Sequence, residues 1–406
     1  MWATLMWGSR RDLAFIGRLS RHANLASLED QGLVRARQGI IRSKSSYREY
    51  PELLDRPLLL PRDFPIDDSL FLDAGQLAIN RDANVYSKDS TDFRAFNLPQ
   101  LVVKQTCMKT EQRFRAAIIK SSENLGGAIC TDSFASVHLE HGNPEVLENL
   151  CLVFNSALAL YFLLLTSGRF AMDRNEPQLE DFRSVPVPES SQGVLAGVSN
   201  VSDVDERVRT MFGFTEAQWI LVEDLMDYTL PDYKEGANSP GRSLTTRNDL
   251  IGGIIEPELT AYCETLRRVL HAAFGPEKHI GAVIFSEPTG ERLPVRLVSV
   301  YLNEPDISSV HVEEMGAPDL RSRLTKLYLE LLATENSSQY HQRTVRTYDA
   351  LQTKGTGIVV NLIKPDQVRY WTRSMAMRDA DEIVADFLLW QGAQDAQSMH
   401  KQATHG

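Results

Sequence analysis

The feature that most constrains this chain is an uninterrupted apolar run near its middle. Nine consecutive apolar residues extend from Ala157 to Leu165, and the apolar residues 150–154 precede them, separated only by Asn155 and Ser156. A membrane-spanning helix needs roughly 20 predominantly apolar residues, and charged residues flank this shorter stretch on both sides. The run therefore predicts one long helix over residues 144–166, buried in the core of a soluble domain.

The composition is that of a globular protein of two or three domains. The chain has 406 residues, of which 43% are hydrophobic and 24% are charged. Its first residues contain no cationic region followed by an apolar region and a cleavage site, so we predict no secretory signal. Four cysteines, none in a Cys-x-x-Cys spacing, indicate reduced thiols and no zinc site. We therefore expect a cytoplasmic protein.

Charge is distributed unevenly along the chain. The net charge is −11, but residues 1–120 hold 19 basic and 14 acidic residues, whereas the remainder holds 24 basic and 40 acidic ones. A basic N-terminal part can meet phosphate groups, and an acidic C-terminal part cannot do so over a broad surface. Charge alone leaves two interpretations open: an N-terminal surface for nucleic acid, or charge scattered over solvated positions.

The hydrophobic pattern divides the chain into two folded parts, the first of which covers residues 1–188. Its expected elements are a short strand, a helix after a turn at Gly8-Ser9, a basic loop (32–50), a strand (101–106) and a strand or helix (113–120). The segment SVPVPES, residues 184–190, cannot be helical and ends this part. Residues 189–203 are small and polar, which indicates a linker.

The second part covers residues 204–395 and is followed by a tail, residues 396–406, that we expect to be disordered. Its expected elements are helices at 204–212, 215–228 and 257–274, a hairpin around 288–290, a helix at 319–332, a strand at 357–365 and a helix at 374–390. This order is not a repeating β-α-β series. The predicted fold class is α+β, with an α/β N-terminal domain around the long buried helix and a mixed α+β C-terminal domain.

Five segments of the first part, in chain order, carry a resemblance to a known family. They are MWATLMWGSRRDLAFIGRLS, LVRARQGIIRSK, LPQLVVKQ followed by RFRAAI, LVFNSALALYFLLLTSG, and LEDFRSVPVPE. Over residues 1–190 the chain resembles the target recognition region that follows the catalytic domain in type IIG-like adenine-specific DNA methyltransferases of restriction–modification systems. The resemblance implies a module that reads double-stranded DNA, with the long helix as part of its scaffold.

The resemblance does not extend to catalysis. Methyl transfer to adenine needs a glycine-rich loop for S-adenosylmethionine and an Asn/Asp-Pro-Pro-Tyr/Phe loop for the flipped base, and the sequence contains neither. We therefore expect no catalytic residue, cofactor or metal in this chain, and no membrane partner. S-adenosylmethionine is implied for a separate methyltransferase subunit or domain. The expected function is DNA recognition in a methyltransferase, restriction–modification or phage-defence complex, together with other defence proteins.

The candidate DNA contacts are basic and polar side chains of the segments that carry the resemblance. Arginine and lysine neutralise phosphates, arginine also reads guanine, and glutamine reads adenine in the major groove. The first two residues of the set are expected to contact the DNA backbone, and the others suit both kinds of contact. The set is Arg10, Arg11, Arg35, Arg37, Gln38, Arg42, Lys44, Ser45, Lys104, Arg113 and Arg115.

Polar residues also concentrate beside the last predicted strand. The segment IKPDQVRYWTRSMAMRDADEIVADF is similar to companions of such methyltransferases in defence loci. Two interpretations are open: the acidic residues bind a hard cation or the arginines a phosphate, or acidic residues favour a helix N-terminal half and an Arg–Asp pair joins helix to strand. The cluster comprises Lys364, Arg369, Trp371, Arg373, Arg378, Asp379, Asp381 and Glu382.

Two other functions are compatible with this sequence. The chain could be a protein-binding adaptor in a defence assembly, with its basic surface directed at an acidic protein. Its C-terminal domain could instead be a nuclease or hydrolase, although the one Asp-x-Lys element, Asp232 to Lys234, lies in a predicted helix-to-loop transition and not in a strand.

Overall fold

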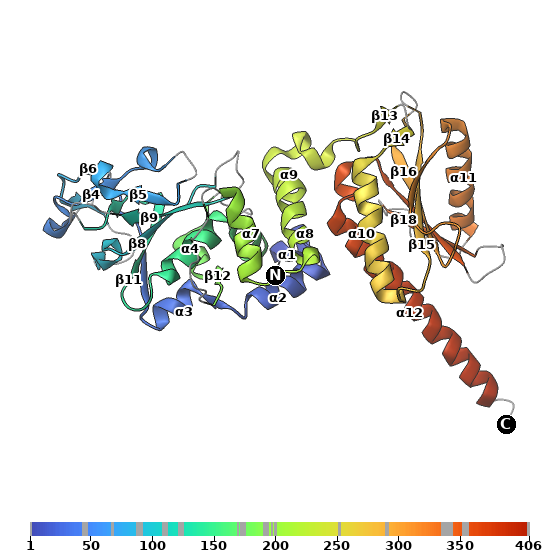
Figure 1. The fold of residues 1–406 in the computed structure, drawn as a ribbon, viewed down its shortest axis with the longest axis horizontal. Coiled ribbons are helices and arrows are strands. Elements are labelled where there is room, and N and C mark those ends of the chain that lie inside the picture. The colour runs from blue at the N-terminus through green and yellow to red at the C-terminus, as the bar shows by residue number, and fades with distance from the viewer. Residues whose placement is uncertain are drawn as a thin grey trace. The chain divides into compact units, whose positions relative to one another are not determined.

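The chain folds into two compact units, Met1–Met226 and Asp227–Gly406, which are described separately (Figure 1). The boundary lies in a π-helical segment, Leu225–Thr229, so residues 204–226 belong to the first unit and not, as expected, to the second. The predicted α+β class is confirmed. The computed structural model describes residues 2–42, 48–65, 69–86, 92–107, 113–120, 126–168, 170, 176–189, 195, 198, 201–250, 253–288, 292–333, 344–350 and 357–403.

A mixed five-stranded sheet forms the centre of unit 1. Neighbouring strands run antiparallel except for the last pair, which is parallel. The strand predicted at 101–106 is confirmed. The segment 113–120, predicted as either a strand or a helix, is also a strand. In spatial order the strands are β2 (Val34–Gln38), β11 (Phe134–Leu139), β8 (Gln100–Lys104), β9 (Arg115–Lys120) and β5 (Phe71–Asp73).

A three-stranded sheet packs on one face of the central sheet. Phe64 stacks on Phe134 of the central sheet with ring centroids 5.6 Å apart, inside a buried apolar cluster. The small sheet contains β10 (Ile129–Cys130), β4 (Pro57–Leu59) and β6 (Ala78–Ile79), and two further pairs are β3 (Arg48–Glu49) with β7 (Asn84–Val85) and β1 (Ala23–Asn24) with β12 (Pro186–Val187). Short 3₁₀ helices are formed by Pro51–Leu53, Pro61–Asp63, Ala74–Gln76 and Phe93–Phe96.

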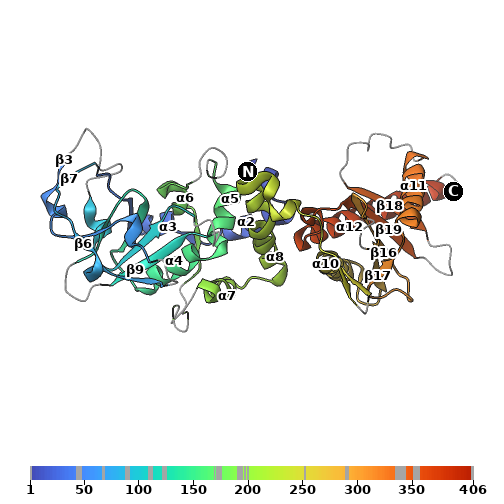
Figure 2. The same ribbon diagram turned by 90° about the horizontal axis from the view of Figure 1, so that it is seen from above.

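Helices cover the remainder of unit 1. They are α1 (Trp2–Trp7), α2 (Arg10–Leu19), α3 (Leu25–Asp30), α4 (Glu145–Asn155), α5 (Ala157–Thr166), α6 (Leu179–Arg183), α7 (Val201–Met211) and α8 (Glu216–Asp224). Helix α4 packs against β8 and β9, beside which it lies in both views (Figure 2). The predicted N-cap of α8, Thr215, is confirmed: its side chain accepts from the backbone N–H of Gln218.

The short strand expected at the N-terminus is helix α1 instead. A short, wholly apolar run has no periodicity that separates strand from helix, so packing decides its conformation. Helix α1 packs against α5, and the hydroxyl of Thr4 donates to the carbonyl oxygen of Leu165 at 2.8 Å. The helix predicted after Gly8-Ser9 is α2. Ser9 and Asp12 form a capping box at its N-terminus.

The long helix expected at residues 144–166 is two helices, α4 and α5, which are bent by 72° at Ser156. The prediction of one helix is therefore wrong, although burial of the run is confirmed: Leu158 to Leu165 are at most 3% exposed. The break falls at the Asn155-Ser156 interruption of the run, but because both helices are largely buried the apolar pattern alone did not predict it. Within the described residues no single helix is long and apolar enough to cross a membrane. The bent pair α4 and α5 reaches the required length and apolar composition only when the two helices are taken together.

Unit 2 is built on a second five-stranded sheet. The predicted hairpin is confirmed as the antiparallel pair of the second and third strands, and the strand predicted at 357–365 is the fourth. The two outer strands were not predicted. In spatial order the strands are β17 (Val310–Glu314), β15 (Ile280–Ser286), β16 (Val295–Leu302), β19 (Ile358–Pro365) and β18 (Val345–Ala350), and a separate hairpin contains β13 (Asn248–Leu250) and β14 (Gly253–Ile255).

The two faces of this sheet carry different helices (Figure 1). The helices are α9 (Leu230–Glu235), α10 (Pro257–Phe274), α11 (Ala317–Ala333) and α12 (Arg373–Ala403), with 3₁₀ helices at Gly236–Asn238, Pro240–Arg242 and Val368–Tyr370. Helices α10 and α12 pack on one face, and α11 packs on the other. The tail expected to be disordered from residue 396 continues α12 as far as Ala403.

Candidate functional site

The strand register of unit 1 brings three predicted contact residues to one end of the central sheet. Gln38 pairs with Ala135, and Lys104 pairs with both Phe134 and Arg115. Antiparallel strands place these positions at the same end although they are up to 77 residues apart in the chain. The question is therefore which of these side chains a ligand can reach.

Arg37 is buried and not in a loop as predicted. It lies in strand β2 with 2% of its surface exposed. Its guanidinium carbon lies 4.5 Å from the ring centroid of Phe93 and 4.8 Å from that of Phe96, and its Nη1 donates to the carbonyl oxygen of Asp92 at 2.9 Å. Cation–π contacts and backbone hydrogen bonds of this kind stabilise a fold. The expected DNA contact by Arg37 is contradicted.

Gln38 is also committed to the fold. Its amide and that of Gln105 form a reciprocal pair, in which each nitrogen donates to the other oxygen at 2.8 Å. Gly39, next in the chain, passes so close to Thr131 that an added Cβ would lie 2.0 Å from the Thr131 carbonyl oxygen. Gln38 is 7% exposed, so reading adenine would first require breaking this pair.

Arg35 belongs to an ion-pair cluster at the opposite end of β2. Its Nη1 lies 2.7 Å from Asp92 and its Nε lies 2.7 Å from Glu140. Arg94 also pairs with Asp92 at 2.7 Å. The hydrogen bond from Arg94, with the charge of Arg35, lowers the pKa of the Asp92 carboxyl from 3.8 to about 2. The two arginines of this cluster are neutralised by its two carboxylates, so Arg35 has little net positive charge to attract a phosphate.

The pH dependence of stability tests this cluster. Because the folded pKa of Asp92 is below its unfolded value, its contribution is complete above pH 4 and is lost as pH falls toward 2. We expect the free energy of unfolding of Asp92→Asn to fall less steeply over this range than that of the wild type, with the two curves converging near pH 2. Urea unfolding at several pH values measures this; Asp30→Asn, an exposed site, is the control, and parallel curves would contradict the assignment.

Arg113 and Arg115 are structural as well. Arg113 pairs with Asp205 of α7 at 2.8 Å, and the other oxygen of that carboxylate accepts from the backbone N–H of Ala157 at 2.9 Å. Arg113 thus holds the carboxylate that caps the start of α5. Arg115 is 3% exposed. Burial contradicts the DNA contact predicted for Arg115, whereas the side chain of Arg113 is 19% exposed but held by its ion pair with Asp205.

Among the described residues, four further predicted cations are accessible to solvent. Arg10 and Arg42 are exposed, and Arg11 and Lys104 are half-buried. Lys44 and Ser45 lie outside the described residues.

Sequence analysis missed Arg62, whose side chain is 80% exposed. It lies two residues before Phe64, and the Nζ of Lys104 lies 6.0 Å from the centroid of the Phe64 ring. The sequence pattern that could have indicated its exposure is a turn that begins with proline, Pro61–Asp63, directly before Phe64. We call Arg42, Arg62 and Lys104 the basic sheet end.

In unit 2 the predicted cluster centres on a buried lysine. Lys364 of β19 donates to the carboxylate of Asp379 in α12, and the hydroxyl of Tyr262 donates to the same oxygen at 2.6 Å. The ammonium lies 5.2 Å from the ring centroid of Trp371. Lys364 and Trp371 are at most 1% exposed and Asp379 is 3% exposed. This is the ion pair between helix and strand that was one of the two interpretations, with lysine in place of arginine.

The other members of the cluster do not converge on a ligand site. Arg369 lies 3.4 Å from Asp232, and Arg378 lies 3.1 Å from Glu382, which also pairs with Arg346. Arg373 is half-buried and Asp381 is exposed. Within the part of the chain that the structure describes, no three His, Cys, Asp or Glu side chains are grouped so that they could hold a metal ion. The cation interpretation therefore has no support from geometry.

A second buried ionic network was missed. Arg296 and Glu256 are both fully buried and bonded to each other. Arg247 contacts Glu256 at 3.2 Å and Glu287 at 3.0 Å. No local pattern indicates this network, because its members are spread from residue 247 to 296 without a motif. It fixes the segment around β13 and β14 to the sheet of unit 2.

No protein-family model matches this chain, and no curated protein is significantly similar to it.

Proposed function

We propose that unit 1 recognises double-stranded DNA through the basic sheet end, as the specificity component of an adenine methyltransferase, restriction–modification or phage-defence complex in the cytoplasm. Methyl transfer, with S-adenosylmethionine, belongs to a separate subunit or domain. The proposal rests on the resemblance of residues 1–190 and on one structural observation. The strand register puts the end of β8, with Lys104, and the end of β2, which precedes Arg42, at one end of the central sheet, and Arg62 lies two residues before the Phe64 ring that Lys104 contacts.

Several features of the basic sheet end suit a phosphate backbone. Lys104 ends strand β8, Arg42 follows β2, and Arg62 lies in the turn after β4. Their spacing in the chain is wide, but the aromatic pair Phe64 and Phe134 holds the turn against the sheet. Rigid strands position such contacts better than free loops do. Phosphate contacts of this kind supply affinity and register.

We expect the double variant Arg42→Ala/Lys104→Ala to bind a fluorescein-labelled duplex more weakly than the wild type. Each lost phosphate contact should lower the slope of log affinity against log salt concentration by about 1, so by about 2 for the pair. Fluorescence anisotropy at several salt concentrations measures both quantities. Circular dichroism verifies that the variant is folded.

The matched control is Arg81→Ala, which removes one exposed arginine of the same unit. Arg81 is 77% exposed and forms a surface ion pair with Asp55. It follows β6, at the end of the small sheet opposite to Arg62. Its salt slope should equal that of the wild type. Equal slopes for all three proteins would disprove the basic sheet end as a DNA contact.

The two alternatives remain proposals with distinct signatures. An adaptor would bind an acidic protein and show no salt-dependent shift with a duplex. A nuclease in unit 2 would degrade DNA in the presence of magnesium or manganese. Because Asp379 is buried against Lys364, its replacement would disturb folding, so the exposed Asp381 is the appropriate site for an alanine variant in that assay.

A further inference from the structure

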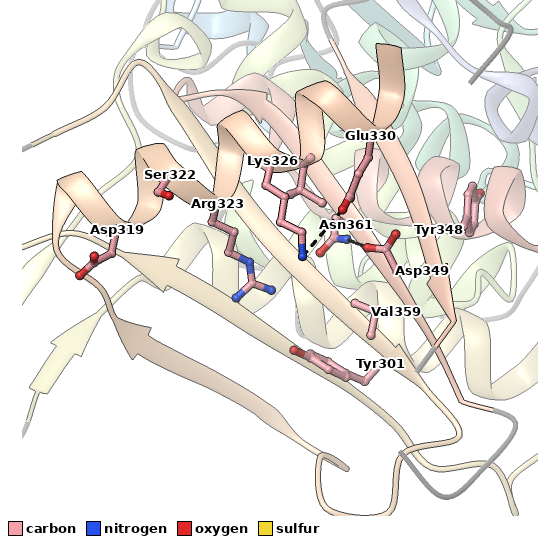
Figure 3. A pocket seen from close by; sticks show the side chains of 11 residues that line it. Tyr301, Asp319, Ser322, Arg323, Lys326, Glu330, Tyr348, Asp349, Val359 and Asn361 are labelled. Atoms are coloured by element: carbon pink, nitrogen blue, oxygen red, sulfur yellow. Dashed lines mark hydrogen bonds and ion pairs between the residues drawn. The ribbon is translucent and has the colours of Figure 1, made fainter. Parts of the chain in front are cut away.

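A cavity of about 1000 Å³ lies between helix α11 and the sheet of unit 2 (Figure 3). One wall is a single stripe of α11, on which residues three and four positions apart share a face. The stripe consists of Asp319, Ser322, Arg323, Lys326, Leu327 and Glu330. The other side is formed by Tyr301, Val359, Asn361 and residues of β18.

The cavity exists because α11 covers only part of its face of the sheet. Leu320 and Leu327 pack with Val283 and Phe285 of β15 and with Leu297 of β16, the strands on one side of the sheet. Strand β19 contributes Ile363, near its C-terminal end, to this apolar cluster, and no described residue of β18 is part of it. A helix placed over one half of a five-stranded sheet leaves the other half accessible beneath its edge.

A row of polar side chains crosses this part of the sheet. Register pairs Ser299 with Asn361 and Asn361 with Thr347, so all three share one face. The hydroxyl of Ser299 donates to Asn361 Oδ1 at 2.6 Å, and Asn361 Nδ2 donates to Asp349 Oδ2 at 2.7 Å. Ser299 and Asn361 are at most 2% exposed.

The opposite face of the same strands is apolar. Val298, Val300, Val360 and Leu362 all pack against the helices there. Buried polar groups are tolerated where they are hydrogen-bonded, as the members of this row are to one another. The polar row is restricted to the face that the cavity exposes.

Charges of both signs line the cavity, with Asp319 and Glu330 on α11 beside the two cations and Asp349 on the strand side. Arg323 and Lys326 extend from α11 toward the strands, with Tyr301 and Val359 opposite them (Figure 3). Arg323 stacks on Phe285 at 4.0 Å and donates to Ser299 at 3.3 Å, which fixes its direction. Lys326 is 78% exposed and lies 3.8 Å from Glu330. Asp349 supplies a carboxylate on the strand side.

We propose that this cavity binds a nucleoside monophosphate. Arg323 and Lys326 would hold the phosphate, the ring of Tyr301 offers a stacking surface for the base, and Asp349 would accept from ribose hydroxyls. Small-molecule sites measure roughly 300–1,000 Å³, so the volume suits a nucleotide and exceeds what a bare phosphate needs. A purely anionic ligand would also be repelled by the three carboxylates of the lining, Asp319, Glu330 and Asp349. The site lies in unit 2 and is independent of the DNA contact proposed for unit 1.

Isothermal titration of the full chain tests this proposal, with AMP, GMP, CMP and UMP in turn as probes. At least one should bind saturably with one site per chain, and the matching nucleoside and inorganic phosphate should each bind about tenfold more weakly or worse. Lys326→Met should weaken the nucleotide by about ten- to a hundredfold and leave the nucleoside unchanged, since it removes a charged contact to the phosphate. Asp349→Asn should weaken both.

The matched control is Arg321→Met, which removes an exposed arginine two residues from Arg323 on the same helix. It should bind the nucleotide as the wild type does. The proposal is wrong if no nucleotide binds at millimolar concentration, if inorganic phosphate binds as tightly as the nucleotides, or if Arg321→Met and Lys326→Met lose affinity equally. Thermal unfolding of each variant confirms that unit 2 is folded.

Discussion

Replacing Arg296 by methionine should lower the free energy of unfolding of unit 2 by about 3–5 kcal/mol. Arg296 is fully buried, and its Nη1 donates to Thr245 Oγ1 and lies 3.1 Å from Glu256. Methionine fills a similar volume but leaves the buried carboxylate of Glu256 without one of its two arginines. Removing one partner of a buried ion pair is strongly destabilising because the remaining charge cannot be solvated.

Hydrogen exchange of peptides from β15 and β16 measures this loss for unit 2 alone. The double variant Arg296→Met/Glu256→Gln should lose less than the single variant, because the uncompensated charge is gone. Arg321→Met, at an exposed position, should change stability by less than about 0.5 kcal/mol. A loss for Arg296→Met as small as that of Arg321→Met would show that the network does not stabilise the unit.

Replacing Asn155 by leucine should lower the free energy of unfolding of unit 1 by about 2–5 kcal/mol. Its Oδ1 accepts from the backbone N–H of Ala116 at 3.1 Å, and its Nδ2 donates to the carbonyl oxygens of Ala116 and Cys151, both at 2.8 Å. The amide thus bonds to β9 as a neighbouring strand would. Leucine cannot make these bonds, and each buried peptide group left unsatisfied costs about 1–3 kcal/mol.

Urea unfolding followed by hydrogen exchange in β9 measures the effect. The control is Asn143→Leu, an exposed asparagine whose side chain accepts from the backbone of Glu145 at 3.1 Å; it should cost about 1 kcal/mol or less. Equal losses for the two variants would mean that Asn155 is not a bridge between α4 and the sheet. A larger loss at Asn155 than at Asn143 would explain why a polar pair interrupts the longest apolar run of the chain.

The elements of unit 2 follow more closely from the sequence than the accessibility of the DNA contacts predicted for unit 1. The helix Pro257–Phe274 was predicted with its bounds, because its apolar period and first-turn proline are local properties. Arg37 and Gln38 were predicted as loop residues because glycines and charges dominate the surrounding sequence. Their burial depends on partners such as Phe93 and Gln105, far along the chain, which no local pattern indicates.

The sequence by itself determined the α+β class, the burial of the apolar run, the hairpin of unit 2 and the absence of methyltransferase motifs, because each depends on composition or on short-range periodicity. Only the tertiary structure decided that the run bends at Ser156, that Arg35, Arg37, Arg113 and Arg115 are bound within the fold, and that Lys104 lies beside the Phe64 ring at one end of the central sheet. The physical reason is that contacts between residues distant in the chain determine whether a charged side chain is accessible, whereas its charge follows directly from the residue type.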